Sequence, residues 1–167
     1  INQSFLKDLN IHYIPDTFEY LKQHESKFDI IIALDVLEHI DVNQQIYICQ
    51  LIHNALKTNG LFLGTVPNSN SSLASTWRYI DWTHKSSFTE HSFDFILYNS
   101  GFKKIEIKGL EFFNKPKFSW KNRKAVKHWL MFRMVRKFRR MEMVAELGPD
   151  QGFNVPLSLN LLGFAQK

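Results

Sequence analysis

The chain has 167 residues, and its hydrophobic content of 44% is enough to build a packed core, which excludes wholesale disorder. Its single cysteine, Cys49, excludes an intramolecular disulfide and fits a buried, inert thiol in a reducing compartment. The net charge is +5, yet 11 of the 21 Lys and Arg residues lie between Lys115 and Arg140, where Asp and Glu are absent. The remainder has 10 cations against 16 Asp and Glu, so the sequence predicts an acidic-leaning domain with one basic segment.

Strands and helices alternate along the sequence. The best strand signal is the Ile-rich run 30–34, which is continuously apolar and is expected to be covered on both faces of a sheet. In chain order we expect a strand at 11–14, a helix at 17–23, a strand at 30–34, a helix at 43–57 ended by Asn59 and Gly60, a strand at 61–66, a polar loop at 68–76, a helix at 90–99, a strand at 102–107, a helix at 120–147, a turn at 148–152 and a strand at 157–165. This order predicts an α/β fold with a mostly parallel sheet. We expect a single domain over 1–167, with a basic helical insertion at 114–147 before the last strand.

The carboxyl ends of the predicted strands are the places where a ligand is expected. In open α/β sheets, ligands bind in the crevice beyond those ends. The rule selects three places here, namely 15–18, 35–39 and the loop that follows Pro67. These three places are candidate sites whichever family the chain belongs to.

Several motifs in this order carry a family resemblance. The run 28–40 ends in Asp-Val-Leu-Glu-His, and 56–68 reads Leu-Lys-Thr-Asn-Gly-Leu-Phe-Leu-Gly-Thr-Val-Pro-Asn. Asp81-Trp-Thr-His84, Phe88-Thr89 and Ser100-Gly-Phe102 follow. Together they resemble class I S-adenosylmethionine-dependent methyltransferases, and within them a subgroup that modifies small molecules and glycans, often in cell-surface polysaccharide synthesis. The resemblance implies a Rossmann-like three-layer α/β sandwich and S-adenosylmethionine as cofactor.

The sequence departs from the family in two respects. The family's first strand with its glycine-rich loop has no counterpart, and Gly-x-Gly occurs nowhere in these 167 residues. The acidic residue that ends the family's second strand is missing too. The resemblance therefore implies a fragment that begins just after that second strand, and the chain alone is not expected to hold the cofactor normally.

The resemblance assigns cofactor contacts to two of the strand ends. It places Asp16 against the adenine amino group, with backbone N–H groups of Thr17 or Phe18 meeting a ring nitrogen. The alternative for Asp16 is a helix cap, and both roles are compatible. At the second strand end, the segment from Leu34 through Asp35 to Val36 is expected beside the methionine and ribose portion.

Acceptor-side residues are expected around His84 and His39. Methyl transfer to a hydroxyl needs the acceptor's proton removed, and a histidine near its ordinary pKa suits that task. Asp81 is expected to orient the His84 imidazole. The alternative for Asp81 and His84 is that they anchor a loop, and the alternative for His39 is a structural role. Glu38 is expected to be solvated or paired with a cation.

Substrate and metal residues are less marked in the sequence. Asn68, Arg78 and Tyr79 are candidates for binding a polar or anionic substrate, because Arg suits carboxylate and phosphate groups. The seven histidines form no His-x-x-x-His pair and Cys49 has no partner motif, so we expect no zinc site and assign no metal ligand. A magnesium ion held by scattered carboxylates stays open, because such sites need no local signature.

The basic segment leaves three interpretations open. Its helix either packs an apolar face on the domain, lies on an anionic membrane surface, or binds nucleic acid. A homodimer through this helix is a further expectation. No apolar run approaches the roughly 20 residues that span a bilayer, so we expect a cytoplasmic protein, at most peripheral to the membrane.

The function expected from these observations is methyl transfer from S-adenosylmethionine to a hydroxyl, less readily an amine, of a small molecule or glycan. One alternative is a non-catalytic methyltransferase-like module that docks a membrane or partner through the basic helix. A second alternative is an RNA methyltransferase, for which the basic segment is the support.

Overall fold

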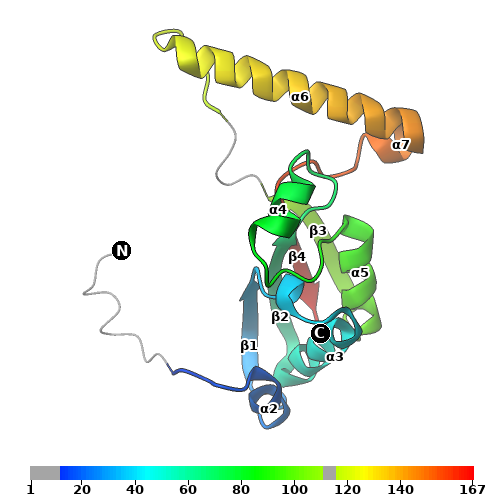
Figure 1. The fold of residues 1–167 in the computed structure, drawn as a ribbon. Helices are drawn as coiled ribbons and strands as arrows, with labels where there is room; N and C mark the ends of the chain where they lie inside the picture. Colours follow the sequence, from blue (N-terminus) through cyan, green and yellow to red (C-terminus); the bar gives the residue numbers. More distant parts are fainter. Residues whose placement is uncertain (1–11, 111–115) are drawn as a thin grey trace.

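The computed structural model describes residues 12–110 and 116–167, and Figure 1 shows their arrangement. The elements are α2 (Thr17–Lys22), β1 (Phe28–Leu34), the short 3₁₀ helix η1 (Leu37–His39), α3 (Val42–Ala55), β2 (Leu56–Pro67), α4 (Ala74–Ile80), α5 (Glu90–Asn99), β3 (Lys104–Leu110), α6 (Arg123–Leu147), α7 (Pro149–Gly152) and β4 (Asn160–Gln166). Asp16 caps α2 by accepting a hydrogen bond from the Glu19 amide at 3.0 Å, as its position before the helix predicts.

The four strands form one sheet in the order β1-β2-β4-β3. β1 is parallel to β2, whereas β4 is antiparallel to both of its neighbours, β2 and β3. β1, β2 and β3 therefore point in the same direction, and β4 alone runs against them. This confirms the α/β class. Three of the four described strands point the same way, although only the β1–β2 pairing is parallel and the sheet is therefore mixed.

The core lies between the sheet and the helices α3 and α5, which cover the same face (Figure 1). Three phenylalanines from different elements, Phe62 on β2, Phe93 on α5 and Phe102 before β3, are at most 1% exposed. Cys49 on α3 is fully buried among them, and burial raises the pKa of its thiol to about 12, as expected for an inert thiol.

The opposite face of the sheet is open among the described residues. Ile30, Ile32 and Leu34 on β1 are 57–61% exposed, and Leu61 on β2 is 46% exposed. The expectation that β1 is covered on both faces is therefore wrong for the part of the chain that the structure describes. The reason is that the helices packed on the sheet all lie on the face of Phe62 and Ala33.

Several boundaries differ from the sequence-based expectation. Residues 12–14 form no strand, and Ile11 lies outside the described residues. α3 ends at Ala55, and β2 begins at once with Leu56, because Leu56 is fully buried and pairs with Phe28. Asn59, at a positive φ of 64°, belongs to an irregularity within β2. α4 occupies part of the predicted polar loop, 149–152 form a helical turn, and the last strand begins only at Asn160.

The long basic helix forms, but it does not bury its apolar face. α6 has no buried residue, and it extends away from the sheet in Figure 1. Its exposed apolar stripe consists of Leu130, Met131, Met134, Val135, Phe138 and Met141, which are 42–61% exposed. The interpretation that this face packs on the domain is therefore wrong for the described residues. No helix in the described ranges is long and apolar enough to cross a membrane.

Gly163 on β4 tests the packing of the core. A Cβ at this position would lie 2.6 Å from one ring atom of Phe93 and 2.8 Å from another. We expect Gly163→Ala to lower the free energy of unfolding by about 1–3 kcal/mol, because the added methyl overpacks the core. Urea unfolding measures this.

A double mutant gives the control. In a Phe93→Leu background the added methyl has room. Gly163→Ala should therefore lower the free energy of unfolding by less in that background than in the native protein. Equal costs in the two backgrounds would show that Phe93 is not the obstacle.

Candidate functional site

The site is built where β1 ends and the chain turns into η1. The main-chain carbonyl of Glu38 accepts hydrogen bonds from the amides of Lys85 (2.7 Å) and Ser86 (3.3 Å). The Gln45 side chain on α3 donates to the Leu37 carbonyl at 3.0 Å and to the Ser86 hydroxyl at 2.7 Å. These bonds fasten the 81–86 loop to the end of β1, so that residues 45 positions apart share one site.

Glu38 is the buried acid of this site. Its side chain is 1% exposed, and among the described residues neither carboxylate oxygen has a hydrogen-bond partner. Burial raises the pKa of Glu38 to about 7, aided by the nearby Asp35 and Asp81 carboxylates. The expectation that Glu38 is solvated or paired with a cation is therefore wrong.

The hydrogen bonds of the two histidines fix which ring nitrogen carries the proton. Nδ1 of His84 lies 2.8 Å from the Trp77 carbonyl, which only accepts, so this nitrogen is the donor. Nδ1 of His39 lies 2.8 Å from the Thr83 hydroxyl, whose own hydrogen goes to Asp81 at 2.7 Å. In the neutral form of each ring Nε2 therefore carries the lone pair, and no described residue donates a hydrogen bond to it.

Asp81 acts differently from the sequence-based expectation. Its carboxylate accepts from the Thr83 amide at 2.8 Å and from the Thr83 hydroxyl, and these bonds, with the nearby histidines, lower its pKa. The expectation that Asp81 orients His84 is wrong, because the Trp77 carbonyl holds that ring. Asp81 instead orients His39 through Thr83.

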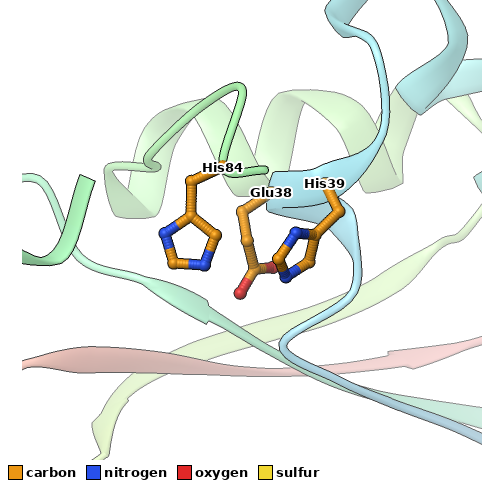
Figure 2. A group of neighbouring side chains, drawn as sticks. All are labelled: Glu38, His39 and His84. Atoms are coloured by element: carbon orange, nitrogen blue, oxygen red, sulfur yellow. The ribbon is translucent and has the colours of Figure 1, made fainter. Parts of the chain in front are cut away.

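The side chains of Glu38, His39 and His84 converge, as Figure 2 shows. One ligand atom from each lies within 4.8 Å of the other two, and the two imidazole centroids are 4.7 Å apart. We call these three residues the Glu-His-His cluster. Sequence reasoning selected both histidines but missed Glu38 and Thr83, whose roles depend on a contact between distant segments.

The cofactor-side residues lie on exposed surface. Asp16 and Thr17 are exposed, Phe18 is half-buried, and the Asp16 carboxylate already caps α2. The Asp16 carboxylate can accept further hydrogen bonds, because one oxygen is enough for the cap. Contact of these three residues with adenine remains a prediction.

The end of β1 has the chemistry expected for one side of a cofactor site. Asp35 adopts a positive φ of 53°, which a non-glycine residue reaches only when its surroundings hold it. Its amide donates to the Thr65 hydroxyl at 3.0 Å, and its carboxylate accepts from Thr65 (2.9 Å) and Asn160 (3.1 Å). With Leu34 and Val36 exposed on either side, a carboxylate and apolar surface stand together, which fits the ribose and the methionine chain.

The three substrate candidates fall into different places. Asn68 is 1% exposed, and its amide donates to the carbonyls of Pro156 and Ser158 at 2.9 and 2.8 Å. Arg78 donates to the carbonyls of His84 and Lys85, so it holds the loop of the cluster. Tyr79 is 77% exposed and lies with Arg78 beside a shallow hollow that Ser69 and Ser75 also line. Substrate contact by these residues remains a prediction, and the geometry favours Tyr79.

The comparisons with known proteins concern the family of the chain and its fold. A family model described as a methyltransferase domain matches residues 6–107. The chain belongs to this methyltransferase family. No curated protein matches the chain.

Solved structures agree on the fold. An S-adenosylmethionine-dependent methyltransferase from Archaeoglobus fulgidus is similar over 100% of this chain and 73% of its own, with 21% identity and a TM-score of 0.64. Another from Thermotoga maritima is similar over 94% of this chain and 64% of its own, with 10% identity and a TM-score of 0.58. A third from Mesorhizobium loti covers 96% and 71%, with 15% identity and a TM-score of 0.52. S-adenosylmethionine is accordingly the cofactor of this class.

Asn68 provides a test of how the loop after β2 is held. We expect Asn68→Ala to lower the free energy of unfolding by about 1–3 kcal/mol, because the buried carbonyl of Ser158 and the part-buried carbonyl of Pro156 lose their donor. The exposed Asn99, which bonds only the carbonyl of Phe95 on its own helix, is the matched control. We expect Asn99→Ala to stay within about 0.5 kcal/mol of the native value. A similar result for both variants would contradict the structural role of Asn68.

Proposed function

We propose that this chain carries the acceptor side of an enzyme that transfers a methyl group from S-adenosylmethionine to a hydroxyl of a small molecule or glycan. The observation that carries the proposal is the Glu-His-His cluster, which gathers two free imidazole lone pairs beside the end of β1. Family membership supports methyl transfer, and the cluster supports the choice of acceptor atom.

The cofactor, when bound, supplies a methyl group on a positively charged sulfur. We expect Asp16, Thr17 and Phe18 to hold its adenine, and the segment 34–36 to line its ribose and methionine chain. The acceptor then has to reach the methyl carbon in line with the bond to sulfur. Holding the two reactants in this geometry is expected to supply much of the rate.

A hydroxyl acceptor fits the cluster better than an amine. A neutral amine attacks without first losing a proton, whereas a hydroxyl becomes a strong nucleophile only as its proton leaves. Nε2 of His84, with its lone pair free, is placed to accept that proton, and Nε2 of His39 is the second candidate. Asp81 and Thr83 position His39, and the Arg78 guanidinium positions the loop that carries His84.

His84 is the residue on which this assignment depends. In the full-length gene product we expect His84→Ala to lower kcat about 100-fold or more, because the acceptor's proton loses its binding partner. Affinity for S-adenosylmethionine, measured by calorimetry, should stay nearly unchanged. His91→Ala removes an exposed histidine on α5 and should retain the native rate. Native turnover in the His84 variant would refute the assignment.

The apolar stripe of α6 favours a second role, which accompanies catalysis or replaces it. At 3.6 residues per turn, Leu130, Met134, Phe138 and Met141 line the same side of the helix. Arg133 and Lys137 flank this side, and no described residue of α6 is buried. An exposed apolar stripe with cations beside it is one feature of a helix that lies in the interface of an anionic membrane. We propose such a surface as its binding partner.

Liposome binding tests this second proposal. We expect the chain to co-sediment with vesicles that contain phosphatidylglycerol, to bind phosphatidylcholine vesicles weakly, and to lose binding as salt rises. Phe138→Ser should weaken binding several-fold, because it removes apolar area from the interface. Phe95→Ser, on α5, is the matched control, since Phe95 and Phe138 are 60% and 61% exposed. Salt-sensitive binding to RNA without binding to vesicles would favour an RNA methyltransferase instead.

A further inference from the structure

We infer that the Glu-His-His cluster is a binding site for one divalent transition-metal ion, with Zn²⁺, Co²⁺ and Mn²⁺ as the fitting class. The three side chains present one carboxylate and two imidazoles, and these ligand types suit first-row divalent ions. Mg²⁺ fits less well, because it prefers oxygen ligands. The cluster has no sequence signature, since its ligands come from η1 and from a loop 45 residues away.

The separation of the three ligand atoms suits a common ion. Ligands bonded at about 2.1 Å lie roughly 3–3.5 Å from one another around a tetrahedral or octahedral centre. Here the three atoms lie within 4.8 Å of one another. The ion therefore has to draw them together by up to about 1–2 Å, which rotations about side-chain torsions supply without moving the backbone.

The outer contacts of both imidazoles are those of metal ligands. A metal-bound histidine usually donates its second ring nitrogen to a carbonyl or a carboxylate, which fixes the tautomer and the ring orientation. His84 donates Nδ1–H to the Trp77 carbonyl, and His39 donates Nδ1–H to Thr83, which is itself bonded to Asp81. The Nδ1 contacts thus hold both rings in the metal-free protein, and Nε2 of each ring is left to coordinate the ion.

Glu38 supplies an independent reason for an ion. A buried carboxylate with neither oxygen hydrogen-bonded is costly, and buried charges in proteins are paired or coordinate metals. Among the described residues no Lys or Arg reaches the Glu38 oxygens. The nearby cation, Lys85, pairs with Asp41 at 2.8 Å instead. A divalent ion between Glu38 and the two imidazoles gives this carboxylate a partner.

The site leaves room for a further ligand. Three protein ligands with an open position are the arrangement of catalytic metal sites. An ion there would bind the acceptor hydroxyl and lower its pKa, and the proton would then pass to solvent water. In the metal-bound protein the two histidines hold the ion, and in the metal-free protein they are the proton acceptors proposed above. This role rests on the proposed function, whereas binding of the ion does not.

Titration of the metal-free chain with Co²⁺ tests the inference. The visible absorption of protein-bound Co²⁺ reports coordination directly and needs neither cofactor nor acceptor. We expect one equivalent to bind, and Zn²⁺ to displace it. Glu38→Gln, His39→Ala and His84→Ala should each weaken Co²⁺ binding at least 10-fold, and Thr83→Val, which only frees His39, about 10-fold.

His91→Ala, which removes an exposed histidine outside the cluster, should leave the titration unchanged, and circular dichroism of each variant establishes that it is folded. Glu38→Gln keeps the shape of the buried side chain, so loss of binding in a folded protein assigns the carboxylate. Absence of Co²⁺ binding, or binding that survives all three cluster substitutions, overturns the inference. A chain that binds Co²⁺ through the cluster but shows no methyl transfer in its full-length form would retain the metal site and refute the proposed function.

Discussion

Two successive main-chain amides, those of Lys85 and Ser86, donate to the carbonyl of Glu38, and the rest of the site depends on this contact. It fastens a loop that follows α4 to the end of a strand that lies far earlier in the sequence. Gln45 strengthens the junction by bonding both segments at once. Without this junction nothing else described above would hold His84 beside His39. The sheet positions His39, which follows β1, but it does not position the loop that carries His84.

The junction also explains how the Glu38 carboxyl group comes to be buried without a hydrogen-bond partner among the described residues. Leu37, the neighbour of Glu38, is 1% exposed in the core, and the Glu38 carbonyl is held from the opposite side. The Glu38 side chain is therefore kept out of contact with solvent. Such a cost persists in a folded protein only where the surrounding structure imposes it, and it is often found at functional sites. Asp35, strained at the end of the same strand, is a second case within three residues.

The sequence contained enough information to predict most elements and the two histidines. The apolar run 30–34 predicts β1, the position of Asp16 predicts the start of α2, and the strand-end rule selects His39. The unpaired burial of Glu38 could not be predicted, because it depends on the amides of Lys85 and Ser86, which local patterns do not connect to it. The spacing of apolar residues predicts a helical Leu56, and its pairing with Phe28 in the sheet overrides that preference. The exposed face of α6 was unpredictable for a related reason, since spacing reveals an apolar stripe but not what covers it.

The basic helix α6 contacts the loop that follows β2. Arg139 on α6 donates to the Asn70 carbonyl at 3.3 Å, and Asn70 follows the carboxyl end of β2. The basic helix is therefore attached on the side of the sheet where the end of β1 presents the cluster and the segment 34–36. A membrane bound by the apolar stripe would hold that edge of the sheet near the lipid surface. An acceptor glycan carried on a lipid would then arrive at the cluster from the surface to which α6 is bound, so that the two proposals describe one geometry.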